Sequence, residues 1–205
     1  MCIRDSSSTP QDKSGTINPL ESFCTVVRTR LNSHSMVMCG EVDCYDHLSR
    51  EKPPLNYIEL KTNRFIYTDR NKASFKKNKL LKWWAQSFLV GVPKIICGFR
   101  DDDGIVNNLQ PFRTIDIPRE CQSDLSLWQA SVCLNFLDEL LNWMKATVTN
   151  NDLQMVYIIE WTKPFTHISA THQLSTPDTV VLHDWYLNKQ EPLTPKSQPP
   201  SPPQN

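Results

Sequence analysis

Alternating apolar and polar residues mark several short segments of the chain. Side chains along a strand point to opposite faces of a sheet in turn, so alternation is typical of a half-buried strand, and short apolar runs bounded by turn residues are also consistent with strands. These patterns predict strands over residues 23–31, 36–44, 56–62, 94–100, 112–117, 154–161 and 166–173. Asp102-Asp103-Gly104 predicts a turn that joins 94–100 to Ile105-Val106 in a hairpin. Residues 118–130 are expected to be irregular, and a last apolar run covers 180–186.

Two longer segments show the period of a helix. The first covers about residues 74–90, and the apolar stripe predicted to face the core consists of Leu81, Trp84, Ala85 and Phe88. A second stripe with the same spacing, expected to lie outside the apolar face, consists of Lys79, Lys82, Trp83 and Gln86. The second helix covers about residues 131–148, and the side chains expected to point inward are Val132, Phe136, Leu140, Trp143 and Met144.

Composition limits the classes of protein to which the chain can belong. The 205 residues are enough for one ordinary domain, and 22 basic residues balance 22 acidic ones. No global field attracts nucleic acid, so any basic surface must be local. Seven cysteines without a C-x-x-C pair do not form a disulfide framework, which indicates a reducing compartment. No signal peptide or long apolar span is visible, so we expect a soluble intracellular protein, nuclear or cytoplasmic, without membrane contact.

The ends of the chain differ from its middle. Residues 1–20 are polar and aperiodic, which predicts a disordered or foreign leader. From residue 188 onward the proline density excludes helix and sheet, so residues 188–205 are expected to be an extended tail. Residues 21–187 are expected to form the C-terminal part of a single folded domain.

Charged residues spaced by two lie on two of the expected strands. Glu41 and Asp43 belong to the segment 36–44, whereas Glu59 and Lys61 belong to 56–62. Residues i and i+2 share one face, so neighbouring strands would bring three carboxylates and one ammonium together. Val42 and Leu60 would then point to the opposite face, into a core.

Three carboxylates on a partly buried face repel one another, and one lysine does not balance them. A hard divalent cation, Mg²⁺ or Mn²⁺, would balance them and keep water ligands for a phosphate, and two ions can clamp a phosphodiester. The order Asp-spacer-Glu-x-Lys is that of metal-dependent nucleases of the PD-(D/E)xK type. A solvated face of salt bridges remains the alternative interpretation.

Two further clusters allow more than one interpretation. The stripe of Lys79, Lys82 and Gln86 continues a basic segment that would suit a phosphate backbone, although a lysine run is also typical of a solvated helix face. A zinc site is conceivable because four potential ligands lie close in sequence, namely His34, Cys39, Cys44 and His47. The two cysteines have opposite strand parity, which argues against zinc.

Six blocks in one order closely resemble the decapping exoribonuclease (DXO, or Dom3Z) family. They read FCTVVRTRL, CGEVDC, YIELKT, KLLKWWAQSFLVGVP, GFRDDDGIV and SVCLNF, and the resemblance covers about residues 23–186. It implies a mixed α/β (α+β) fold with a central sheet flanked by helices, related to PD-(D/E)xK nucleases. It also implies a hydrolase that removes incompletely methylated or NAD-type caps from RNA 5′ ends and that can degrade the RNA 5′→3′.

The resemblance also assigns roles to single residues. It implies that Glu41, Asp43 and Glu59 hold metal together with the carbonyl of Leu60. Lys61 would lie beside the scissile phosphate and assist the attacking water. The positions that would contact substrate are Cys24, Glu41, Lys61 and Gln86. The basic helix stripe, independently of the resemblance, adds Lys79 and Lys82, which would help to grip the RNA.

One part of the family pattern has no counterpart in this sequence. An arginine motif and a Gly-x-hydrophobic-x-Glu motif precede the acidic strands in the family, whereas Glu21 is the only earlier glutamate here. We therefore expect an N-terminally truncated version of the domain, with weak two-metal binding. Three hypotheses follow. The chain is a Mg²⁺- or Mn²⁺-dependent decapping nuclease acting on RNA 5′ ends in mRNA decay, or a catalytically inactive fragment that binds RNA or a protein, or a fragment that does not fold because its sheet exposes an edge.

Overall fold

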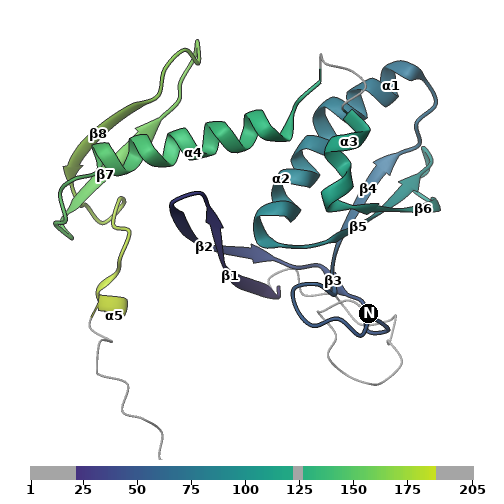
Figure 1. Ribbon diagram of the computed structural model, residues 1–205, viewed down its shortest axis with the longest axis horizontal. Coiled ribbons are helices and arrows are strands. Elements are labelled where there is room, and N and C mark those ends of the chain that lie inside the picture. The colour runs from purple at the N-terminus through teal and green to yellow at the C-terminus, as the bar shows by residue number, and fades with distance from the viewer. Residues whose placement is uncertain (1–21, 122–126, 188–205) are drawn as a thin grey trace, which may run out of the picture. The chain divides into compact units, whose positions relative to one another are not determined.

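The computed structural model describes residues 22–121 and 127–187, and the expected leader and tail lie outside them (Figure 1). The chain divides into two compact units, residues 1–141 and 142–205. In the first unit, a hairpin pairs β1 (Cys24–Leu31) with β2 (His34–Glu41). Asn32 in its turn has a φ of +48°, a left-handed conformation that asparagine tolerates better than most residues.

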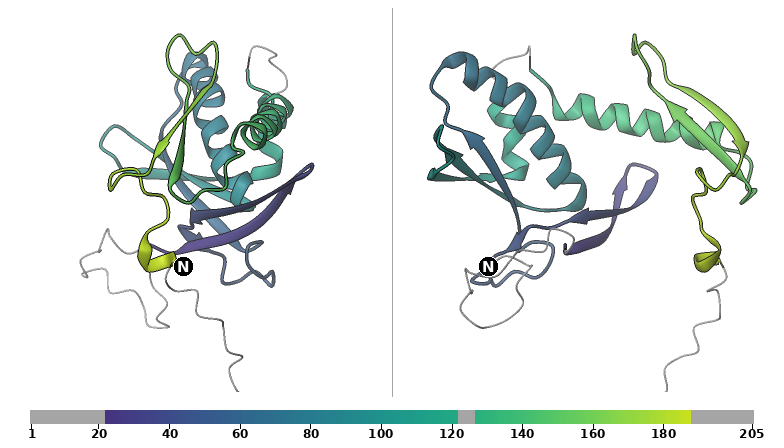
Figure 2. Two further views of the ribbon diagram at one scale, coloured as in Figure 1. Left: turned by 90° about the vertical axis from the view of Figure 1, so that its left-hand side faces the viewer. Right: turned by 180° about the vertical axis from the view of Figure 1, so that it is seen from behind.

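A four-stranded sheet forms the centre of the first unit. Its order is β3-β4-β5-β6, and its strands are β3 (Cys44–Tyr45), β4 (Tyr57–Arg64), β5 (Lys94–Arg100) and β6 (Val106–Arg113). Strands β4 and β5 are parallel, and the other pairs are antiparallel. Parallel neighbours need a crossover, which here is a helix along one face of the sheet (Figures 1 and 2).

The crossover helix is continuous from Asp69 to Val90 but changes its winding. It consists of α1 (Asp69–Ser74), the π-helical segment η1 (Phe75–Leu80) and α2 (Leu81–Val90). It ends at Gly91, whose φ of +77° is easily adopted by glycine and whose N–H donates to the carbonyl of Phe88 at 3.2 Å. The helix expected over 74–90 is confirmed and begins one turn earlier.

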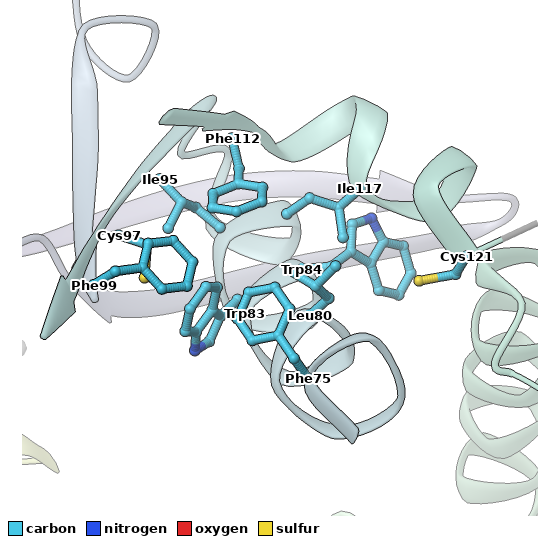
Figure 3. Packing of buried hydrophobic residues seen from close by; sticks show 10 residues of the cluster. All are labelled: Phe75, Leu80, Trp83, Trp84, Ile95, Cys97, Phe99, Phe112, Ile117 and Cys121. Atoms are coloured by element: carbon cyan, nitrogen blue, oxygen red, sulfur yellow. The ribbon is translucent and has the colours of Figure 1, made fainter. Parts of the chain in front are cut away.

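Aromatic side chains of this helix pack on β5 and β6 (Figure 3). Phe75 and Trp83 meet edge to face with ring centroids 5.2 Å apart, and both rings also approach Phe112. The buried cluster consists of Phe75, Leu80, Trp83, Trp84, Ile95, Cys97, Phe99, Phe112, Ile117 and Cys121. The core therefore lies on the face of the sheet that the helix covers.

The inward faces expected for both helices are partly wrong. In α2, Trp83 is 5% exposed although we expected it in the basic stripe, and Phe88 is 36% exposed although we expected it in the core. Ser87 is buried and belongs to the helix face that packs on the core. Because serine is polar, a search for apolar residues does not identify that face. In the second helix, α4 (Ala130–Thr147), Val132 and Phe136 are exposed. The apolar side of α4 is wide: Val132 and Phe136 lie toward one edge of it, whereas Leu134, Leu137 and Leu141 on the other side are half-buried.

Three sheet expectations also need correction. The segment 36–44 is not one strand, because β2 ends at Glu41 and β3 starts at Cys44, and β2 pairs with β1 rather than with β4. Val42 is buried as expected, but Leu60 is 43% exposed, because the crossover helix covers the opposite face of β4. The strand expected over 112–117 stops at Arg113.

After β6 the chain turns into helix. Thr114 donates from its backbone N–H to the carbonyl of Pro93 and from its hydroxyl to that of Val92, which ends the strand. A 3₁₀ turn, η2 (Thr114–Asp116), leads into α3 (Ile117–Cys121), which replaces part of the segment expected to be irregular.

The second unit contains the end of α4 and a hairpin of β7 (Met155–Glu160) with β8 (Ser169–Leu174). Both strands confirm the sequence pattern. The last apolar run ends in a short helix, α5 (Asp184–Leu187). Within the described ranges, no helix is both long enough and apolar enough to cross a membrane.

Candidate metal and phosphate site

A closed triangle of contacts joins β4 to α2. Lys61 Nζ donates to Glu59 Oε1 at 2.5 Å and to Gln86 Oε1 at 3.1 Å, and Gln86 Nε2 donates to the same Glu59 oxygen at 2.9 Å. Glu59 and Lys61 share one face of β4 because they are two residues apart. The crossover connection places α2, and thus Gln86, over that face. The structure therefore brings together three of the predicted site residues, of which Gln86 is distant in sequence from the other two.

Asp43 reaches β4 from the link between β2 and β3. Its Oδ2 accepts a hydrogen bond from the backbone N–H of Leu60 at 2.9 Å. The carboxylate occupies a position at which a continuous strand would have supplied a carbonyl, which explains why pairing pauses there. This hydrogen bond fixes Asp43 beside Leu60, the residue between Glu59 and Lys61.

Glu41 ends β2 next to the same site, and its cross-strand partner is Cys24. Residues opposite each other in an antiparallel pair point to the same face, so the Cys24 thiol and the Glu41 carboxylate lie side by side on the exposed face of the hairpin. Val42 follows Glu41 and is held by its N–H to the carbonyl of Phe23 at 2.9 Å.

Burial dominates the electrostatics of Glu59. The side chain is almost inaccessible, and its burial raises its pKa, an effect that the Lys61 ammonium opposes. The negative charges of Asp43 and Glu41 raise this pKa further, because both carboxylates lie within electrostatic range of Glu59. One ammonium does not neutralise three carboxylates, so the site favours an added cation.

The available donors suit a hard divalent ion. Glu41, Asp43, Glu59 and the Leu60 carbonyl offer only oxygen, which Mg²⁺ and Mn²⁺ prefer. In the part of the chain that the structure describes, however, no three acidic, histidine or cysteine side chains are close enough together to hold an ion. The carboxylates are within electrostatic range without converging on one point. Binding therefore requires a small movement or additional ligands.

For the remaining predicted residues, the structure gives exposure and charge effects rather than direct contacts with the triangle. Lys79 and Lys82 are exposed on the crossover helix, and the charge of Lys79 acts on Cys97, the β5 neighbour of Lys61. Cys39 is exposed on β2 and Cys44 is buried on β3, so the two cysteines lie on strands of different sheets.

One residue on the same face of β4 was not predicted. Asn63 continues the face of Glu59 and Lys61, and no charge or resemblance drew attention to it. The same period of two that linked Glu59 to Lys61 would have identified it.

A pair of acidic positions followed by Glu-x-Lys, on a sheet with a crossover helix, defines the core of a metal-dependent nuclease of the PD-(D/E)xK class. A family model described as RAI1 like PD-(D/E)XK nuclease matches residues 2–187, and the chain belongs to this family. Membership confirms the resemblance to decapping nucleases and the mixed α/β fold.

Curated relatives carry names that agree with the family. The chain is 39% identical over 185 residues to "Decapping and exoribonuclease protein" of Xenopus laevis, covering 90% of this chain and 46% of the relative. It is 41% identical over 162 residues to the Homo sapiens protein of the same name, covering 78% and 41%. The chain thus spans less than half the length of these relatives.

Solved structures share the fold. Candida albicans Rai1 in complex with pU5 and Mn²⁺ superposes with a TM-score of 0.71 at 30% identity, covering 78% of this chain and 43% of that one. Scheffersomyces stipitis Rai1 in complex with (3′-NADP)⁺ and calcium gives a TM-score of 0.67 at 25% identity, covering 74% and 40%.

Proposed function

We propose that this chain carries the metal-binding and phosphate-positioning part of a divalent-metal-dependent RNA 5′-end hydrolase. Its substrates would be RNAs with incomplete or NAD-type caps or with a 5′-triphosphate, and its role would be 5′-end quality control in mRNA decay. The observation that supports this most is the contact triangle of Glu59, Lys61 and Gln86 beside Asp43 and Glu41, in a family whose curated relatives are named decapping nucleases.

Metal ligation would fall to Glu41, Asp43, Glu59 and the carbonyl of Leu60, with Mg²⁺ or Mn²⁺ as the ion and two ions in a complete site. When bound, such an ion neutralises the carboxylates and polarises the phosphate that is attacked. A related Rai1 binds Mn²⁺ together with pU5, which supports both the ion and the RNA ligand.

Lys61 positions the reacting groups in this proposal. An ammonium has three N–H donors, and two are directed at Glu59 and Gln86. The third can donate to the attacking water or to a phosphate oxygen, where it stabilises the negative charge that develops. Gln86 keeps the ammonium beside Glu59 by bonding to both residues. Cys24, Glu41 and Gln86 would also contact the substrate.

A hydrolysis assay tests this function. The purified chain would be incubated with Mn²⁺ and either 5′-triphosphate RNA or NAD-capped RNA, and release of pyrophosphate or NAD would be measured. We expect release by the parent chain and a loss of about a hundredfold or more in Glu59→Gln and Asp43→Asn. Glu51→Gln, which removes a carboxylate from an exposed loop, is the matched control and should retain activity. Equal rates in the parent and in Glu59→Gln would refute the proposal.

A second function is favoured by two observations. No three acidic side chains converge in the described ranges, and the chain spans less than half of its curated relatives. It could therefore bind RNA, or a protein, without hydrolysing RNA. A folded parent chain that binds pU5 but releases no product from either RNA would support this alternative.

A further inference from the structure

A basic cavity of about 310 Å³ lies beyond the candidate site along β4. Residues 63–66, which are the end of β4 and the two residues after it, form one wall, and the opposite wall comes from α1 and η1. Three cationic side chains, Arg64, Arg70 and Lys79, line it, and no acidic side chain does among the described residues. Arg64 is paired with Asp102, so the positive charge that no acidic lining residue offsets is that of Arg70 and Lys79.

The cavity continues the face that carries the metal and phosphate site. Glu59, Lys61 and Asn63 follow one another at intervals of two residues on β4, and Asn63 lines the cavity. Successive residues on one face of a strand are about 6.6 Å apart. An extended ligand whose phosphate met Lys61 would thus reach the cavity within one or two nucleotides.

The crossover helix also extends from the candidate site to the cavity. Gln86 contacts Glu59 and Lys61, whereas Lys79, two turns earlier, lines the cavity. The charge of Lys79 acts on Cys97, which lies beside Lys61 in the sheet. Lys79 thus lines the cavity and also lies within electrostatic range of the strand next to Lys61.

Three features of the cavity walls are relevant to ligand binding. Phe75 and Lys79 come from the π-helical segment η1, a winding often found at functional sites. The Arg64 guanidinium is held by Asp102, with Nε and Nη2 donating at 2.5 and 2.7 Å, and it keeps further N–H donors. Phe65 lines the cavity and remains 43% exposed, so its ring can stack with a base.

We propose that this cavity is a second nucleotide subsite, which holds a phosphodiester of the RNA next to the phosphate at Lys61. The proposal rests on the proposed function, since it takes RNA as the ligand. Arg70 and Lys79 bind the phosphate, and Phe65 stacks with the attached base. An acidic peptide is the rival ligand, but the exposed aromatic ring among the cations favours a nucleotide.

Fluorescence anisotropy with 5′-phosphorylated pentauridylate tests the subsite. Binding to the full chain would be measured over a range of salt concentrations, once with Ca²⁺ and once with EDTA. The variant Arg70→Ala/Lys79→Ala removes two cavity cations. Its matched control, Lys72→Ala/Lys77→Ala, removes two exposed cations of the same helix that do not line the cavity. Circular dichroism melts confirm that all variants fold.

We expect the cavity variant to lose about tenfold in affinity in both buffers, typical of lost charged contacts, and its salt slope to fall by about 1.4. The control should bind within about twofold of the parent. Equal losses in the two variants, or no loss in the cavity variant, would overturn the subsite. So would competition by pentaglutamate as strong as that by unlabelled RNA, which would assign the cavity to acidic peptides.

A change in the RNA provides a readout without mutation. Replacing single phosphodiesters by neutral methylphosphonates should weaken binding to the parent at one linkage near the 5′ end and leave the cavity variant unaffected by that change. Failure of the proposed function has a different signature. Ca²⁺ would then add no affinity, and Mn²⁺ would support no hydrolysis, while binding in EDTA would still depend on Arg70 and Lys79.

Discussion

Replacing Gly40 by alanine should disturb the candidate site through packing alone. Gly40 precedes Glu41 at the end of β2 and faces the end of α2. A Cβ added at Gly40 would lie 2.7 Å from Cγ1 of Val90, with Cβ and Cγ2 of Val90 at 3.4 and 3.5 Å. Carbon atoms normally approach to about 3.5–4.0 Å, so either Val90 or β2 must shift.

The expected cost follows from that overlap. Val90 is buried with Val42, Tyr57 and Val92, so it has little room to rotate away. Overpacking of this kind costs about 1–3 kcal/mol of unfolding free energy. Val90→Ala alone should cost about 2 kcal/mol because it removes two buried methyl groups. In the double variant the colliding methyl groups of Val90 are gone, so the methyl group added by Gly40→Ala should cost almost nothing.

Urea unfolding followed by tryptophan fluorescence would measure the parent, the two single variants and the double variant, and the hydrolysis assay would be run beside it. We expect a coupling between Gly40→Ala and Val90→Ala of about 1–3 kcal/mol in the rescuing direction. Activity should fall in Gly40→Ala and recover in the double variant as Glu41 regains its position. Additive losses, or a Gly40→Ala variant within about 0.5 kcal/mol of the parent, would refute this packing argument.

Three further outcomes are expected. Burial raises the pKa of Glu59, so folding stability falls as the pH rises from the ordinary carboxyl pKa through that raised pKa, and the loss is complete above it. At neutral pH the free energy of unfolding of Glu59→Gln should therefore exceed that of the parent by about 0.5–2 kcal/mol, with no gain at a pH below the ordinary carboxyl pKa. Thermal melts of both proteins over a range of pH check this. Burial raises the pKa of the Cys97 thiol to about 11, so iodoacetamide at a pH of about 8 should label exposed Cys24 and leave Cys97 unmodified until unfolding, as read by peptide mass spectrometry. Leu80→Ala should cost about 2–5 kcal/mol in urea unfolding because Leu80 is fully buried, and a loss below about 1 kcal/mol would contradict the packing of η1.

Local patterns were enough to locate most elements. The strand 94–100 coincides with β5 because its apolar run is bounded by Pro93 and by the Asp102-Asp103-Gly104 turn, both local signals. The period of two placed Glu59 and Lys61 on one face, which their direct contact confirms. The helical period placed Gln86 outside the apolar face, where it meets Lys61.

The sequence patterns do not determine which strands pair or which face of β4 forms the core. The spacing of charges did not reveal that β2 pairs with β1, nor that Asp43 leaves the strand to bind the N–H of Leu60. Which face of β4 forms the core depends on the side on which the crossover helix packs, and Leu60 was therefore misplaced. The cavity at Asn63 needed the structure because its walls come from two elements.

The central claim is that the acidic cluster around Glu59 binds a divalent ion. Calorimetric titration of the folded chain with Mn²⁺ tests it most directly, with Glu59→Gln and Asp43→Asn as variants and Glu51→Gln as the control. We expect saturable binding in the parent and in the control, strongly weakened in both site variants. Binding of equal affinity in the parent and in Glu59→Gln, or no binding by a folded parent chain, would contradict the claim.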